Sequence, residues 1–320
     1  MKDIKGFDLL KFLLALVIVS LHASLDNPFL PAPFSKLIQN FQNLAVPGFF
    51  VISSYVFFAR ITDMSSREQR VALWKYEKRV LILYLSWSVI MLPITLRYHD
   101  YLSLSFGLLL FIKDFFFSYT FLASWFFGAL IVGVPIVWLV RNKTSVLLAL
   151  SLLSYSYLSI VKYLPDTIQI PYQWYASNVA APELSFPRGF VWLGMGCVLA
   201  KTRILDRIKM ILYAMGGVFL LIIISLLISW LQLLGVISII VLFYHINVRG
   251  KIGDRTVRMR KLSTLIYCVH YPIIHAVWMI IQQEHSFLVF IVATLICIGI
   301  SEIILTLSFK KKLSFLKYLM

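Results

Sequence analysis

Residues 211–244 read ILYAMGGVFLLIIISLLISWLQLLGVISIIVLFY, a stretch of 34 positions that contains neither a charged residue nor a histidine. A single α-helix of this length would measure about 51 Å, whereas the hydrocarbon core of a bilayer is about 30 Å thick. The stretch is therefore too long for one crossing. We expect two membrane helices, over 210–228 and 231–247, joined by a tight turn around 229–233.

The composition of the whole chain agrees with this expectation. Of 320 residues, 60% are hydrophobic and 14% are charged, against roughly 45–50% and about 25% in soluble domains. The 30 Lys and Arg residues outnumber the 14 Asp and Glu residues, which gives a net charge of +16. Because these charges lie between apolar stretches rather than on a polar surface, we expect a lipid bilayer as a partner and no nucleic acid.

The apolar stretches together predict an all-α, polytopic membrane protein in which residues 1–320 form a single transmembrane domain. A helix needs about 20 predominantly apolar residues to cross the bilayer, so the chain can be divided where charges and turn formers interrupt such stretches. Ten spans result, over 7–25, 44–61, 80–97, 122–140, 145–161, 186–200, 210–228, 231–247, 262–282 and 287–309.

The distribution of basic residues predicts the orientation of these spans. With both termini in the cytoplasm, 24 of the 30 basic residues fall in inside segments, at 1–6, 60–79, 141–143, 201–209, 249–261 and 310–317. Five fall outside, namely Lys36, Arg97, Lys113, Lys162 and Arg188, and Lys11 lies within the first span. Cytoplasmic loops of membrane proteins carry such an excess, so the bias favours ten spans and a multi-pass protein of the cell membrane.

Two segments between the spans have a distinct composition. Residues 102–118 are apolar but are interrupted by Lys113 and Asp114, and we expect an interfacial or re-entrant segment there. Residues 162–185 are rich in proline and aromatic residues, which suits a loop that caps the outer side.

Lys11 and His22 are ionisable residues inside a predicted span, where charge is costly. They are eleven positions apart, which places both on one helix face within about 20° and about 16 Å apart along the axis. Asp8, three positions before Lys11, could pair with it. Either Lys11 snorkels to the inner surface and His22 sits among outer headgroups, or the two line a polar pathway.

Several motifs, in order along the chain, resemble those of acyltransferase family 3, a family of integral-membrane O-acyltransferases. The first is a lysine followed after ten positions by histidine, at Lys11 and His22. The second is VPGFFVISSY, in which Ser54 stands where the family usually has glycine. Further matches are Lys78-Arg79-Val80 with Tyr84 and Trp87, Trp125-Phe126-Phe127, Arg188 with Gly194 and Gly196, and Ser263, Tyr267, His270 and Pro272.

The resemblance implies transfer of an acyl group from cytoplasmic acyl-CoA to a hydroxyl of a surface or exported polysaccharide or its lipid-linked precursor. By analogy the enzyme is an O-acetyltransferase that uses acetyl-CoA, with succinyl or longer groups as alternatives. His22 would act as a general base or carry the acyl group itself, and the sequence leaves both open. Lys11 would contact the donor, and Asp8 would orient Lys11.

The resemblance also implies binding residues for the donor and the acceptor. Lys78, Arg79 and Lys75 would bind the donor phosphates, although any inside loop is basic. Arg188 would bind the acceptor or stabilise an oxyanion, or else anchor the helix at the headgroups. Trp125, Tyr267 and His270 would line the acceptor channel, although the span count places Tyr267 and His270 toward the cytoplasmic half, as packing or donor-side residues.

The sequence predicts no metal centre, no disulfide and no permanently bound cofactor. The three cysteines lie in apolar stretches without C-x-x-C spacing, and His270 and His275 would be about 140° apart on a helix. The main alternative function is a transporter or flippase in which Lys11 and His22 form a polar relay. A structural membrane subunit is a third reading, in which both residues would be replaceable.

Overall fold

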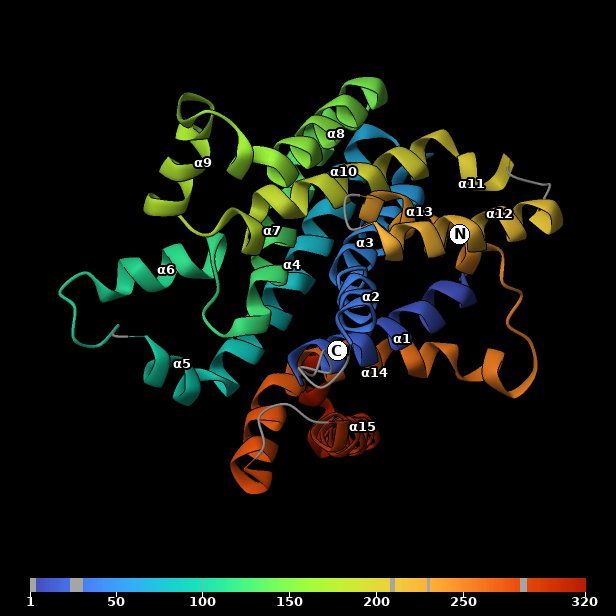
Figure 1. The fold of residues 1–320 in the computed structure, drawn as a ribbon. Helices are drawn as coiled ribbons and strands as arrows, with labels where there is room; N and C mark the ends of the chain where they lie inside the picture. Colours follow the sequence, from blue (N-terminus) through green and yellow to red (C-terminus); the bar gives the residue numbers. More distant parts are fainter. Residues whose placement is uncertain (1–3, 24–30, 100, 208–210, 229–230, 283–286) are drawn as a thin grey trace. The chain divides into compact units, whose positions relative to one another are not determined.

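The computed structural model describes residues 4–23, 31–99, 101–207, 211–228, 231–282 and 287–320. These residues fold into helices joined by short connections, and this part of the chain contains no β-strand (Figure 1). The all-α class expected from the sequence is therefore confirmed. The chain divides into two compact units, one formed by Met1–Phe49 and Leu205–Met320 and the other by Phe50–Ile204.

The helices are distributed over the two units as follows. The first unit contains α1 (Lys5–His22), α2 (Ala32–Gln42), α12 (Ile211–Leu227), α13 (Gln232–His245), α14 (Gly250–Ile281), α15 (Phe287–Leu307) and η5 (Lys311–Leu319). The second contains α4 (Ser66–Ile90), α5 (Leu92–Tyr98), α6 (Gly107–Phe117), η1 (Leu122–Ser124), α7 (Trp125–Val140), α8 (Thr144–Ile160), η2 (Val161–Tyr163), α9 (Asp166–Asn178), η3 (Pro182–Leu184) and α10 (Phe186–Thr202). Two helices cross the boundary, α3 (Ala45–Ile61) and α11 (Ile204–Arg207).

The first unit is organised around two helices that are far apart in the sequence, α1 and α14, which pack against each other along their lengths. Asp8 near the start of α1 forms an ion pair with Arg260 of α14, and His22 at the end of α1 contacts His270 further along α14. The order of these contacts is the same on both helices. The two helices therefore run parallel, and their amino-terminal ends lie at the same end of the pair.

The long uncharged stretch forms two helices, α12 and α13, as expected, and these pack against each other. Gly235 of α13 lies so close to Ser225 of α12 that a Cβ atom added to the glycine would approach the Ser225 Cβ to 2.9 Å. The expected turn includes residues 229–230, which lie outside the described residues.

In the second unit, α10 packs against α7 and α8 and also approaches α3 closely. The Ser54 hydroxyl of α3, which is fully buried, donates a hydrogen bond of 2.5 Å to the carbonyl oxygen of Leu193. Gly196, one turn after Leu193 on α10, lies opposite Val51. A Cβ added to Gly196 would lie 2.5 Å from the Val51 carbonyl oxygen. The small residue that close helix packing requires is thus on α10, facing Ser54.

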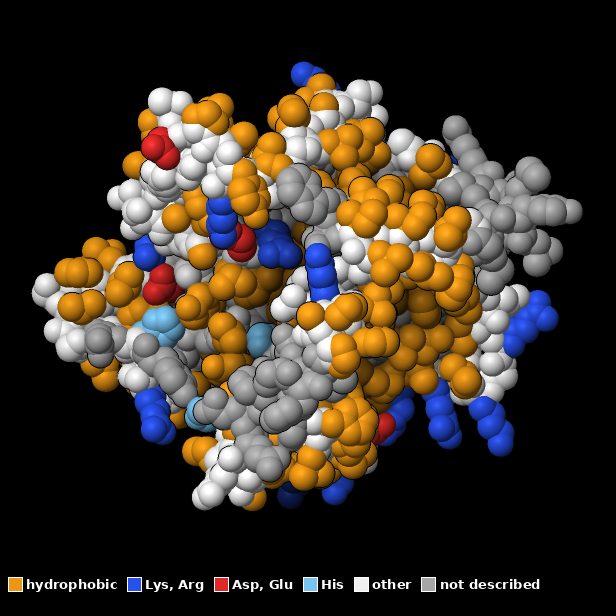
Figure 2. All heavy atoms as spheres, in the orientation of Figure 1, with side chains coloured by type: hydrophobic (Ala, Val, Ile, Leu, Met, Phe, Trp, Pro, Cys, Tyr) orange, Lys and Arg blue, Asp and Glu red, His pale blue; other side chains and the backbone are white. Residues whose placement is uncertain are grey.

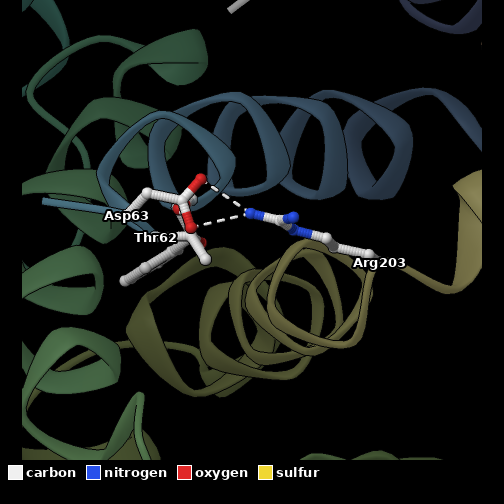
Figure 3. A network of polar contacts seen from close by, with 4 residues as sticks. Thr62, Asp63 and Arg203 are labelled. Atoms are coloured by element: carbon white, nitrogen blue, oxygen red, sulfur yellow. Dashed lines mark hydrogen bonds and ion pairs between the residues drawn. The ribbon is translucent and has the colours of Figure 1, made fainter.

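The ends of α3 and α10 are joined by an ion pair between Asp63 and Arg203 (Figure 3). Arg203 ends α10 in a left-handed conformation with φ 51°, and its Nη2 donates hydrogen bonds of 2.7 and 2.6 Å to the two carboxylate oxygens of Asp63. Thr62, the residue before Asp63, donates a hydrogen bond from its hydroxyl to the carbonyl oxygen of Phe58. Both charged side chains are more than half exposed, so the pair contributes at most about 1 kcal/mol to stability.

Five segments of the described chain are long and apolar enough to cross a membrane. Five of the ten expected spans fall within or coincide closely with them. These candidate spans are Ala32–Ile61, Leu122–Val140, Thr144–Tyr163, Gly250–Ile281 and Phe287–Leu307. On the face shown in Figure 2, hydrophobic side chains cover much of the surface, and Lys and Arg side chains are scattered among them and at the rim. Such exposed apolar surface is typical of a protein that contacts lipid.

The other expected spans correspond to shorter or more polar helices, and their number and orientation remain predictions. The expected span 80–97 is divided between α4 and α5, which meet at Met91. Two basic segments expected in loops, within 60–79 and 249–261, are largely helical instead, in α4 and α14. Lys and Arg are good helix formers, so a membrane helix can continue through such segments into water. The expected re-entrant segment contains α6, whose 11 residues are too short for a crossing.

Candidate functional site

The amino-terminal half of α1 carries Asp8 and Lys11, two of the expected catalytic residues. Asp8 is buried, with 5% of its surface exposed, and its Oδ1 lies 3.6 Å from Nε of Arg260. Lys11 is half-buried one turn further along α1. A buried carboxylate needs a neighbouring positive charge, and Arg260 supplies one. The expected orientation of Lys11 by Asp8 stays a prediction.

The sequence offered little sign of Arg260 as the partner of Asp8. Arg260 is one of six basic residues in 249–261, where the excess of positive charge is explained by orientation alone. Only the parallel packing of α1 on α14 distinguishes it from its neighbours.

At the other end of the helix pair, His22 of α1 contacts His270 of α14. The centroids of the two imidazole rings are 5.0 Å apart and their planes are tilted by 36°. Tyr271 lies with its ring edge toward His22, with centroids 6.0 Å apart. The two histidines thus lie at the same level of the paired helices. This differs from the span count, which separated His22, near the outside, from His270, toward the cytoplasm.

The protonation of His270 follows from its hydrogen bond. Its Nδ1 lies 2.6 Å from the carbonyl oxygen of Tyr267, one turn earlier on α14. A carbonyl oxygen only accepts hydrogen bonds, so Nδ1 carries the hydrogen and Nε2 of the neutral ring carries the lone pair. The side chain is 1% exposed, and among the described residues Nε2 has no hydrogen-bond partner. The ring therefore presents an unused acceptor beside His22.

Aromatic side chains surround this pair of histidines. Tyr267 lies 5.8 Å from His270 and 5.8 Å from Phe49, measured between ring centroids. Phe49 belongs to the motif VPGFFVISSY that sequence analysis singled out. Two motifs far apart in the sequence, around 46–55 and 263–272, therefore contribute to the same part of the first unit.

The three expected donor-binding residues lie together on α4 in the second unit. Lys75, Lys78 and Arg79 are all exposed, and their spacing places them on one face of the helix. Glu77 is partly buried, and burial raises its pKa to about 8, so its carboxyl is largely protonated at neutral pH. The face therefore keeps most of its positive charge, which suits binding of an anion.

Of the expected acceptor-binding residues in the second unit, Trp125 begins α7 and Arg188 lies in the first turn of α10. Trp125 is 8% exposed and packs on Phe50, with ring centroids 5.6 Å apart. Arg188 is half-buried and interacts electrostatically with Glu183, in the loop that precedes α10. The structure thus gives Trp125 a packing role, whereas Arg188 belongs to a polar cluster.

Glu183 is the centre of this cluster, and sequence reasoning did not select it. Its carboxylate accepts a hydrogen bond of 2.6 Å from Tyr172 of α9 and pairs with Lys162 at 3.2 Å. Burial alone would raise the pKa of Glu183, but the Tyr172 hydrogen bond and the Lys162 charge outweigh burial and hold the pKa below its ordinary value. The segment 162–185, expected as a capping loop, contains the helix α9, and the Glu183 carboxylate links that helix to Lys162.

The described residues contain no group of three or more His, Cys, Asp or Glu side chains that could hold a metal ion. The three cysteines, Cys197, Cys268 and Cys297, are buried and free. In the first unit, the described site contains two imidazoles in contact and the ion pair of Asp8 with Arg260.

A family model described as an acyltransferase domain, that of acyltransferase family 3, matches residues 4–306. The resemblance drawn from the sequence motifs is thereby confirmed. The chain is also 28% identical over 138 residues to a curated protein named amino-acid racemase from Enterococcus faecalis. That match covers 43% of this chain and about a fifth, 20%, of the length of the relative. No solved structure matches the chain.

Proposed function

The chain belongs to acyltransferase family 3, and on that basis we propose that it is a membrane-bound O-acyltransferase that uses acyl-CoA as donor and a glycan hydroxyl as acceptor. The acyl group is most simply acetyl. The acceptor is a surface or exported polysaccharide or its lipid-linked precursor, and the protein acts in the cell membrane.

The contact between His22 and His270 carries this proposal. Acyl transfer to a hydroxyl needs a base or a nucleophile at the reacting carbonyl, and an imidazole can serve as either. His22 occupies the family's motif position on α1, and a second imidazole lies beside it at a centroid distance of 5.0 Å. Ionisable residues within membrane helices are expensive to retain, which favours a functional use for the pair.

The donor would be bound through its phosphates and through its extended arm. The exposed basic face of Lys75, Lys78 and Arg79 offers three positive charges to the phosphates. Lys11 lies on α1 between the ion pair of Asp8 and the imidazole of His22, and we assign it to the thioester-bearing arm. Arg188 would contact the acceptor glycan.

The test is thiol release from acetyl-CoA by the purified protein in lipid nanodiscs. His22→Ala should abolish thioester consumption, whereas His275→Ala, on α14 outside the site, should retain it. Size-exclusion elution of both variants reports whether they remain folded. Substrate flux across the membrane without thioester consumption, or full activity of a folded His22→Ala protein, would contradict the assignment and favour a transporter.

A second measurement identifies the acceptor. Mass spectrometry of surface glycans from cells with and without the gene should show loss of one acyl group from a defined sugar. Unchanged glycans would overturn the glycan part of the proposal while leaving the thioester assay to decide the acyl transfer.

A further inference from the structure

Nε2 of His270 is unused among the described residues, and this suggests separate chemical roles for the two histidines. The atom is buried and without a hydrogen-bond partner in the described part of the chain, although leaving a buried polar atom unpaired is costly. Its ring is held by the bond from Nδ1 to the Tyr267 carbonyl. A polar atom retained in this state is suited to receive a hydrogen bond from a bound substrate.

We propose that the two histidines act in sequence, with His22 carrying the acyl group and His270 taking the proton from the acceptor hydroxyl. This inference rests on the proposed acyltransferase function and chooses between the two roles that the sequence left open for His22.

The environment of each ring favours this assignment. His22 is the last residue of α1 and is half-buried, so a donor can reach it. His270 is 1% exposed, and its tautomer is held by a backbone carbonyl. A hydrogen bond from the opposite ring nitrogen to a carbonyl fixes the tautomer and the orientation of an imidazole. A lone pair held in a fixed position can accept the proton of a bound hydroxyl.

The chemistry proceeds in two balanced steps. In the first, a ring nitrogen of His22 forms a bond to the thioester carbonyl, the carbon–sulfur bond breaks, and the thiolate leaves with the proton from His22. In the second, the acceptor oxygen forms a bond to the acyl-imidazole carbonyl while Nε2 of His270 takes the hydroxyl proton. The bond from the carbonyl to His22 breaks, and the departing imidazole nitrogen recovers that proton from His270.

The experiment uses His270→Gln, which approximates the volume of the ring but cannot accept the proton. The variant is expressed in the native host, where the acceptor is present, and the protein is acid-quenched and analysed by peptide mass spectrometry. We expect acylated His22 to accumulate to most of the protein in His270→Gln and to a small fraction in the wild type. Glycan acylation should fall by about 10²–10⁴-fold, the usual contribution of a general base.

Matched variants distinguish loss of the His270 base from loss of folding. His275→Gln, on the same helix, should leave glycan acylation and the acylated fraction unchanged, and His22→Ala should yield no acylated peptide. Equal acylated fractions in His270→Gln and wild type, or unchanged glycan acylation in His270→Gln, would overturn the inference. If His270→Gln fails to fold, the wild-type protein is mixed with acetyl-CoA and quenched rapidly instead. The absence of a transient acyl-His22 species would then overturn the inference.

The proposed function and this inference fail in different ways. A wild-type protein that consumes no acyl-CoA contradicts the acyltransferase assignment itself. A wild-type protein that transfers acyl groups without ever acylating His22 contradicts only the division of labour.

Discussion

Substitution of Gly196 by alanine should destabilise the second unit by driving α3 and α10 apart. A Cβ at this position would lie 2.5 Å from the carbonyl oxygen of Val51 and 2.7 Å from the Cβ of Ser54. The first neighbour is backbone and cannot rotate away. Overpacking of this kind costs about 1–3 kcal/mol, and separation of the helices would also weaken the Ser54 hydrogen bond to Leu193, worth about 1 kcal/mol.

The combined cost is about 2–4 kcal/mol, which corresponds to a fall in melting temperature of roughly 4–12 °C at about 2–3 °C per kcal/mol. The assay is thermal unfolding in detergent, followed by size-exclusion chromatography of the heated protein. Gly299→Ala is the matched control, because outside the backbone of α15 itself no atom of the described residues lies within 4 Å of the added Cβ. There alanine should stabilise the helix by about 0.5–1 kcal/mol.

A melting temperature of Gly196→Ala equal to that of wild type would refute the packing argument. A Ser54→Gly background is a further check, because it removes one of the two colliding atoms together with the Leu193 hydrogen bond. The cost of Gly196→Ala should be smaller in that background than in wild type but should not vanish, since the Val51 carbonyl remains.

Three further predictions concern ionic contacts. Asp63→Asn removes the exposed pair with Arg203 and should lower stability by less than about 1 kcal/mol in low salt, with no difference at 1 M salt in thermal unfolding. Asp8→Asn removes the carboxylate beside Arg260. Because Arg260 is partly exposed, we expect the free energy of unfolding to fall by about 1–2 kcal/mol in the same thermal assay. Unchanged stability would contradict a role for the pair in packing α1. Glu183 has a folded pKa below its unfolded value, so its stabilisation is present above the unfolded pKa and is lost as the pH falls through the folded pKa. Limited proteolysis of the segment 162–185 should therefore accelerate at acid pH in wild type, while Glu183→Gln should be cleaved readily at neutral pH.

The sequence was sufficient for the features that depend on apolar length. The division of 211–244 into α12 and α13 followed from the thickness of a bilayer, and the structure has both helices. His22 was selected because an ionisable residue in a predicted span is costly, and its role stays a prediction. These inferences are local, so they need no knowledge of which helices are neighbours.

Features that depend on which helices pack together could not be predicted from the sequence. Arg260 could not be separated from the other basic residues of 249–261, and Glu183 lies in a loop without a motif. The contact between His22 and His270 was missed because the span count gives the level of each residue within its own helix but not which helices pack together. Ser54 illustrates the same limit, because the compensating small residue, Gly196, lies on another helix.

The parallel packing of α1 and α14 places basic residues at one end of the helix pair and the two imidazoles further along it. The ion pair of Asp8 lies 14 residues before His22 on α1, a distance of about 21 Å along the axis. Because the helices run in the same direction, basic residues at the start of both lie at one end, and the two imidazoles lie further along. A donor arm that enters from this end would therefore have to run along α1 to bring its thioester to His22. This requirement makes Lys11, one turn beyond Asp8 and about 16 Å before His22 along the axis, the residue whose substitution should raise KM for the donor while leaving acylation of His22 possible at saturating donor.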